Sequence, residues 1–193
     1  MRNKMLKTKI KDREIEYTVD YRKVKYIRYE LRGGKLRLIL PKRYDGNIEE
    51  CIHKKEKWIY DKLVEYDEVN VKLEEQTRNI YLIQRTEKEF KNITNRFFEK
   101  YQNQLNVNVK RIQYRHMTTK WGSCSSLGNV TLSKDLIYLP EDLIAYIIYH
   151  ELAHLIILDH SDKFFNIIKK EFPDYKSYDS RLNEYWYLIK NEG

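Results

Sequence analysis

The chain has 193 residues, of which 41% are hydrophobic and 34% are charged, and it has a formal net charge of +8. No stretch approaches the roughly 18 apolar residues of a membrane-spanning helix, and the basic start lacks the apolar segment of a secretory signal. The two cysteines, Cys51 and Cys124, make no disulfide pattern. We therefore expect a soluble globular protein in the reducing cytoplasm, with no membrane partner.

The positive charge is concentrated in the first quarter of the chain. Residues 1–43 hold 15 Lys/Arg and 5 Asp/Glu, whereas residues 44–193 hold 22 Lys/Arg and 24 Asp/Glu. Such a bias attracts nucleic acid or an acidic partner. The plainer interpretation is a solvated face, because Lys and Arg also protect exposed strand edges. Both interpretations stay open at this point.

Alternating apolar residues predict a sheet in the N-terminal part. The expected strands are residues 15–21, 26–31 and 35–40, and Gly33-Gly34 between the last two is typical of a two-residue hairpin turn. Asn47, with Glu50 three positions on, predicts the start of an amphipathic helix over residues 48–66. The polar run of residues 67–75 is the candidate boundary between an N-terminal part, 1–75, and a core, 76–193.

The second part predicts mainly helices around a few strands. We expect a long helix over residues 76–105, strands at 107–114 and 130–137, and a loop between them. Leu139-Pro140 precedes a further helix, because proline is favoured at the first helical position and acids follow it. That helix should end near residues 158–159, and two more helices follow at 162–172 and 178–190.

The stretch YHELAHLIILDHSDKFF (149–165) carries the candidate chemistry. His150 and His154 are four residues apart, so on a helix their imidazoles lie on one face and can bind one zinc ion. In sites of the HExxH pattern the glutamate, here Glu151, accepts a proton from water and does not bind the metal. The pattern also arises by chance in about one or two chains of this length in a hundred, and buried histidines are often structural.

A third ligand would complete a catalytic zinc site. His160 follows six positions after His154 and just before Ser161, where a turn can bring it back to the ion. Asp159 and Cys124 are the alternatives, and Cys124 would indicate a deformylase-like amidase. His53 and His116 show no partner pattern.

The combined motifs are far more specific than HExxH alone. The chain resembles the YgjP-like family of zinc metallopeptidases, which is related to the SprT-like and minigluzincin peptidases. The match is dense over residues 111–172, and the residues that carry it are Arg115, Met117, Trp121 to Ser125, Gly128-Asn129, His150 to Leu155, His160-Ser161 and Phe164-Phe165.

The resemblance implies a single domain, residues 1–193, of the α+β class. An antiparallel strand-rich N-terminal part would precede a helical, zincin-like core with a small sheet and the HExxH helix. It implies Zn²⁺ bound by His150, His154 and His160, with Glu151 as general base for hydrolysis of a peptide or protein substrate. A strand near Gly128 to Ser133 would flank the active-site helix and accept an extended peptide by edge pairing.

Two other hypotheses belong to different functional classes. In one, the basic, tyrosine-interleaved N-terminal sheet binds nucleic acid, and the zinc module acts on proteins found there. In the other, zinc only stabilises a non-catalytic scaffold. For the peptidase, Arg115 and the tyrosines are candidates for stabilising the oxyanion.

Overall fold

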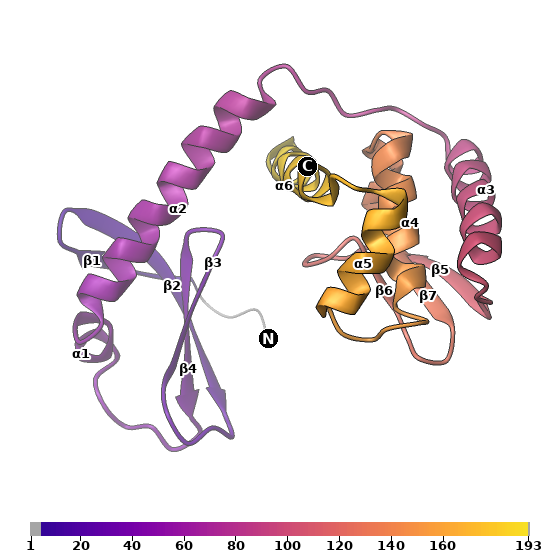
Figure 1. The fold of residues 1–193 in the computed structure, drawn as a ribbon. Coiled ribbons are helices and arrows are strands. Elements are labelled where there is room, and N and C mark those ends of the chain that lie inside the picture. Colours follow the sequence, from indigo (N-terminus) through magenta and orange to yellow (C-terminus); the bar gives the residue numbers. More distant parts are fainter. Residues whose placement is uncertain (1–4, 193) are drawn as a thin grey trace. The chain divides into compact units, whose positions relative to one another are not determined.

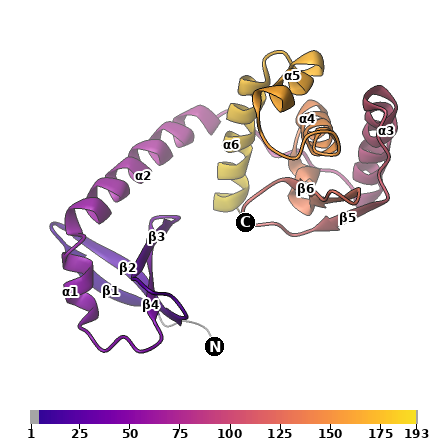
Figure 2. The same cartoon turned by 60° about the horizontal axis from the view of Figure 1, so that its bottom comes forward.

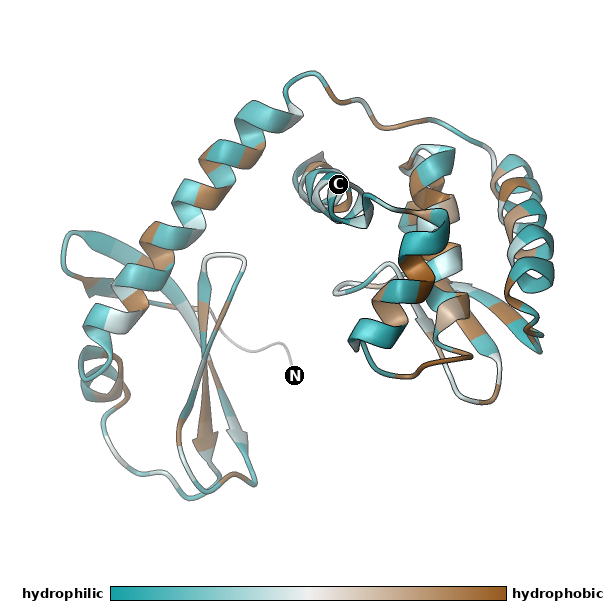
Figure 3. Cartoon of the chain, in the orientation of Figure 1, coloured by the Kyte–Doolittle hydropathy of each residue, from teal (hydrophilic) through white to brown (hydrophobic). Residues whose placement is uncertain are grey.

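Residues 5–192 are described by the computed structural model, and they form a mixed α+β fold, as the sequence predicts. Two units, Met1–Glu75 and Gln76–Gly193, each have a hydrophobic core of their own (Figures 1 and 3). That the two units together act as one domain stays a prediction. Within the described residues no helix combines the length and the apolar character needed to cross a membrane.

The first unit is built on a four-stranded sheet. Its strands are β1 (Leu6–Ile10), β2 (Arg13–Arg22), β3 (Arg28–Arg32) and β4 (Lys35–Pro41), in the order β1-β2-β4-β3. The outer pairings are antiparallel, whereas β2 and β4 are parallel. The predicted hairpin joins β3 to β4, and both its glycines have positive φ, at 56° and 70°. Glycine adopts this conformation without a steric cost.

Two helices cover one face of this sheet. Asn47 caps α1 (Ile48–His53) by accepting a hydrogen bond from the Glu49 backbone N–H at 2.8 Å. After a short break, α2 (Glu56–Thr77) buries Ile59 and Leu63 against the sheet. The predicted connection over residues 67–75 is therefore wrong, because α2 continues through it. Its Glu, Lys and Gln side chains are good helix formers, and their polarity was misleading.

The second unit begins with an irregular segment, and α3 (Glu87–Leu105) starts later than the predicted residue 76. A capping box fixes this start, since the Thr86 hydroxyl accepts from the Glu89 N–H and the Glu89 carboxylate accepts from the Thr86 N–H. Just before it, the Arg85 guanidinium donates to the carbonyl oxygens of Ile137, at 2.8 Å, and of Leu139. These bonds hold residue 85 outside the helix.

A three-stranded sheet follows. It consists of β5 (Arg111–Arg115), β6 (Gly122–Cys124) and β7 (Asn129–Ser133), in the order β5-β7-β6. The predicted strand 130–137 is shorter, because Ser133 caps the 3₁₀ helix η1 (Lys134–Tyr138) by accepting from the Asp135 N–H. Strand β6 lies in the segment that the sequence predicts to be a loop.

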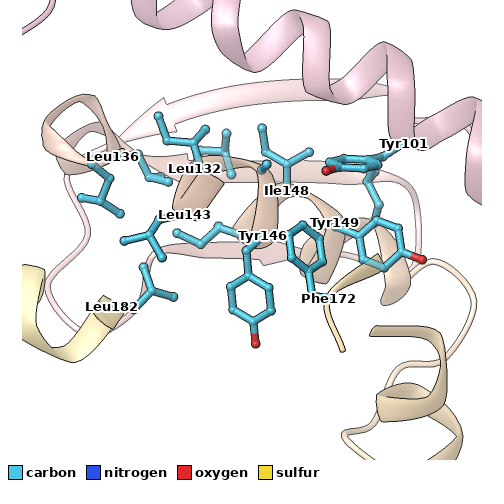
Figure 4. Close-up of a cluster of buried hydrophobic side chains, with 14 of the residues drawn as sticks. Tyr101, Leu132, Leu136, Leu143, Tyr146, Ile148, Tyr149, Phe172 and Leu182 are labelled. Atoms are coloured by element: carbon cyan, nitrogen blue, oxygen red, sulfur yellow. The ribbon is translucent and has the colours of Figure 1, made fainter. Parts of the chain in front are cut away.

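Helix α4 (Glu141–Ala153) is the centre of the second unit. It lies between α3 and α6 (Tyr175–Glu192), with α5 (Asp162–Glu171) also packed on it (Figures 1 and 2). Figure 4 shows its buried side chains among aromatic rings, and the ring centroids of Tyr101 and Tyr149 are 5.0 Å apart. Ten of the thirteen α4 residues are buried, so polar groups on it are held in a low-dielectric interior.

Candidate active site

Helix α4 and the turn after it bring three histidines together. His150 and His154 lie one helical turn apart, and the chain leaves the helix after Ala153, earlier than the sequence predicts. Tight turn bonds, such as Ile157 N–H to the Ala153 carbonyl at 3.0 Å, then reverse the chain. His160 returns to the other two histidines just before Ser161, the N-cap of α5.

The geometry of these histidines fits a zinc ion. One ligand atom from each of the three lies within 4.8 Å of the others, and the Nε2 atoms of His150 and His160 are 3.1 Å apart. Nitrogens bound tetrahedrally to zinc at about 2.0–2.1 Å would be about 3.3 Å apart. His154 donates its Nδ1–H to the Ile157 carbonyl at 3.2 Å, which leaves Nε2 as the ligand atom.

Burial favours the neutral, metal-binding form of two of these rings, His150 and His154. It lowers the pKa of His150 to about 3, and the neighbouring His154 and His160 lower that pKa further. Burial also lowers the pKa of His154. A protonated imidazole cannot coordinate a cation, so the lowered pKa values of His150 and His154 suit a metal site.

Phe164 forms one wall of the histidine cluster. Its ring centroid lies 4.9 Å from that of His150, 4.5 Å from His154 and 4.9 Å from His160. The side chain is fully buried. The sequence pattern places Phe164 four residues after His160 on the first turn of α5, but this packing role was not predicted.

Glu151 is buried beside the cluster and is held by strand β6. Only 7% of the residue is exposed, and burial raises the pKa of its carboxyl to about 7, although the Lys120 charge and a hydrogen bond from the Cys124 backbone N–H act in the opposite direction. A Cβ atom at Gly122 would lie 2.8 Å from both Cγ and Oε1 of Glu151. Glycine at position 122 therefore leaves the space that the glutamate occupies.

The histidines and Glu151 open into a pocket of about 470 Å³. Helix α6 contributes Asp179, which accepts a hydrogen bond from the Tyr146 hydroxyl at 2.7 Å. Sequence reasoning missed this contribution of α6, because nothing in the local pattern connects it to α4. Leu182 of α6 also lines the pocket, and the remaining lining comes from β6 and the segment before it, from α4 and from the turn: Lys120, Trp121, Gly122, Ser123, Cys124, Ile147 and Leu158.

The other candidate ligands have different partners. Asp159 accepts from the Ser161 backbone N–H at 3.1 Å. Cys124 lines the pocket, where burial, and then the Glu151 charge, raise the pKa of its thiol to about 11, and its sulfur is not among the close ligand atoms of the histidine group. Within the described part of the chain, the histidine trio is the one group of three close metal-binding side chains.

The remaining histidines and Arg115 lie elsewhere. His53 is 3.9 Å from Glu56, and His116 is 3.8 Å from Asp135. Arg115 and His116 line a second pocket beside β5, which contains none of the three clustered histidines. Arg115 is therefore not part of the pocket around Glu151.

The sheet order corrects the expectation that a strand near Gly128 to Ser133 accepts a peptide by edge pairing. The segment Gly128 to Ser133 contains β7, which is central and is bonded on both edges, to β5 and to β6. It has no free edge for a peptide. Strands β5 and β6 form the two edges of this sheet, and β6 is the edge strand that contacts α4 at Glu151.

The outer edge of β6 has a defined hydrogen-bonding pattern. The flanking residues Trp121 and Ser125 bond toward β7, through Ser133 N–H to the Trp121 carbonyl at 2.7 Å and Ser125 N–H to the Asn129 carbonyl at 2.9 Å. Because bonded residues alternate in an antiparallel pair, Gly122 and Cys124 direct their backbone groups away from β7. The Cys124 N–H already reaches Glu151.

Comparison with known proteins identifies the family of the chain. The family described as "YgjP-like, metallopeptidase domain" matches residues 67–185, which is more than half of the chain. Two crystal structures of metallopeptidase zymogens are similar to it, those of Pyrococcus abyssi abylysin and Methanocaldococcus jannaschii jannalysin. Each is 26% identical with a TM-score of 0.43, and the alignments cover 46% and 47% of this chain and 90% and 94% of theirs. No match was found among curated proteins. The chain belongs to the YgjP-like metallopeptidase family.

Proposed function

We propose that the chain is a zinc-dependent peptidase in which His150, His154 and His160 hold the metal and Glu151 is the general base. The observation that carries this proposal is the convergence of three imidazoles beside a buried carboxyl group in an open pocket. Family membership supports a metallopeptidase in general. The identity of the metal and the roles of the individual residues are the proposal.

Glu151 would move the proton that hydrolysis requires. Zinc, when bound, supplies a Lewis acid that polarises the scissile carbonyl and lowers the pKa of water to roughly 7. With its own pKa raised to about 7, Glu151 is matched to accept a proton from that water at neutral pH. It would then deliver the proton to the leaving amine. Gly122 and the Cys124 N–H keep the carboxylate in place for both steps.

The peptide substrate would lie along the free edge of β6. Gly122 offers an N–H and a carbonyl there, and Cys124 offers a carbonyl, so an extended chain can add to the sheet beside Glu151. Lys120 lines the same pocket, and its cation would stabilise negative charge on the reacting carbonyl. The Tyr146 hydroxyl already donates its hydrogen bond to Asp179, so we do not assign it this role.

Zinc content and hydrolysis, measured on matched variants, test the proposal. We expect about one zinc per chain in the native protein and in Asp159→Asn, and a large loss in His160→Ala, since only the histidine belongs to the cluster. Glu151→Gln should keep zinc and lose about 10²- to 10⁴-fold in peptide hydrolysis. Full activity in zinc-loaded Glu151→Gln would refute the general-base role. Bound zinc without hydrolysis of any peptide by the native protein would instead indicate a scaffold.

A further inference from the structure

One end of the sheet in the first unit gathers basic residues from two loops. Because β2 and β4 are parallel, they end together at Arg22 and Pro41, and β3 begins beside them at Arg28. The connections over residues 23–27 and 42–47 therefore leave the same end, opposite the Gly33-Gly34 hairpin (Figure 1). We call six residues of this region the basic end: Arg22, Lys23, Lys25, Arg28, Lys42 and Arg43.

The charge of the basic end is not neutralised. Arg22 lies 3.3 Å from Asp20, but among residues 5–192 no carboxylate lies within ion-pair distance of the other five cations. The open face of the same sheet differs. There Lys7 is 2.7 Å from Glu14, Lys35 is 2.9 Å from Glu16, and Arg37 pairs with Asp20. The sheet face is thus largely compensated, whereas five cations without an ion pair to any described residue gather at its end.

Two exposed tyrosines accompany these cations. Tyr21 is 52% exposed and Tyr26 is 69% exposed, and the Lys25 ammonium lies 5.2 Å from the centroid of the Tyr26 ring. Other tyrosines of this sheet serve the fold. Tyr17 is buried, and Tyr29 donates its hydroxyl to the Cys51 carbonyl at 3.0 Å and packs edge-on against Trp58. Tyr21 and Tyr26 therefore expose large aromatic surface without a comparable structural role.

We propose that the basic end, with Tyr21 and Tyr26, binds single-stranded nucleic acid. Unpaired Lys and Arg side chains contact phosphates, and exposed rings stack on unpaired bases, which a duplex does not offer. An anionic membrane would use the cations, but the aliphatic residues of this loop are partly buried, with Ile27 packed on the core. The proposal places binding at the end of the sheet, because the sheet face is neutralised by its own carboxylates.

Binding of the full chain to fluorescein-labelled oligothymidylate, followed by fluorescence anisotropy, tests the proposal. The variant Lys23→Gln/Lys25→Gln/Lys42→Gln removes three unpaired charges, and Lys54→Gln/Lys55→Gln/Lys57→Gln removes three exposed charges elsewhere in the same unit. We expect the first variant to raise the Kd about tenfold or more and the second to change it less than about twofold. The slope of log K against log salt should become shallower by about 2 in the first variant, since each single-strand phosphate contact contributes about 0.7.

The aromatic part is tested at Tyr26, whose ring makes no buried contact that the fold depends on. Tyr26→Ala should raise the Kd about 5- to 100-fold, whereas Tyr26→Phe, which keeps the ring, should bind like the native chain. Circular dichroism melting of each variant confirms that the fold is retained.

Several results would overturn the proposal. One is that the chain does not bind the oligonucleotide at about 50 mM salt. The others are that the two triple variants lose affinity equally, or that the chain binds a duplex of the same length equally well. Binding to anionic phosphatidylserine vesicles with no binding to the oligonucleotide would indicate a membrane surface instead. None of these measurements requires zinc or hydrolysis, so their outcome is independent of the peptidase proposal.

Discussion

Replacing Gly122 by alanine should displace Glu151. The new Cβ would meet Cγ and Oε1 of Glu151 at 2.8 Å and Cδ at 3.0 Å, all well inside ordinary van der Waals contact. The glutamate is only 7% exposed, so it cannot simply swing into solvent. Overpacking of this kind costs about 1–3 kcal/mol in the free energy of unfolding. A base moved by about 1 Å also loses about 10²-fold in kcat/KM.

Removing the Glu151 side chain should reverse the sign of the effect of Gly122→Ala on stability. In a Glu151→Ala background all three close contacts disappear, and Gly122 has no positive φ that would disfavour alanine. There, Gly122→Ala should stabilise by about 0.4–1 kcal/mol, because alanine restricts the unfolded chain. In the native background the same change should destabilise by about 1–3 kcal/mol.

Urea unfolding of the four metal-free proteins measures this double-mutant cycle, and peptide hydrolysis by the zinc-loaded single variant measures the loss of activity. Zinc content should stay unchanged in Gly122→Ala, since the added Cβ meets Glu151 rather than a histidine. If Gly122→Ala had the same effect with and without the Glu151 side chain, contact with that side chain would not be the reason for a glycine at this position.

Two further predictions concern pH and the start of α3. Burial raises the pKa of Glu151 from its usual 4.5 to about 7, so the folded protein holds an extra proton between these values. The protonated Glu151 carboxyl therefore stabilises the folded state, by about 3 kcal/mol at most. This stabilisation is fully present below pH 4.5 and is lost as the pH rises through 7. In urea unfolding of the metal-free proteins, the native chain should lose this stability between pH 4.5 and 7, whereas Glu151→Gln should not. Parallel pH profiles of the two proteins would contradict the prediction. Thr86→Ala removes the capping box with Glu89 and should lower stability by about 1 kcal/mol in the same assay, whereas an unchanged midpoint would mean that α3 does not depend on its cap.

Local patterns were misleading where polar residues form helix or where a few residues form a strand. The run 67–75 is polar, yet it continues α2, and the start of α3 at Glu87 depends on Thr86, Glu89 and the distant carbonyls bound by Arg85. Strand β6 has three residues, too few to show an alternating pattern. It forms because β7 pairs with it and α4 packs against it, and neither contact is visible in three residues of sequence.

The sequence by itself determined the chemistry of the candidate site. The spacing of His150 and His154, and the glutamate between them, are local features that helical periodicity places without further information. The third histidine, His160, could be named as a candidate because it follows a few residues later, before the next helix. Tertiary structure alone decided which edge strand lies beside Glu151, which backbone N–H and glycine hold this residue, and which wall α6 contributes through Asp179. The reason is physical: periodicity fixes the face of one element, whereas register, burial and the resulting pKa values arise only when elements remote in sequence pack together.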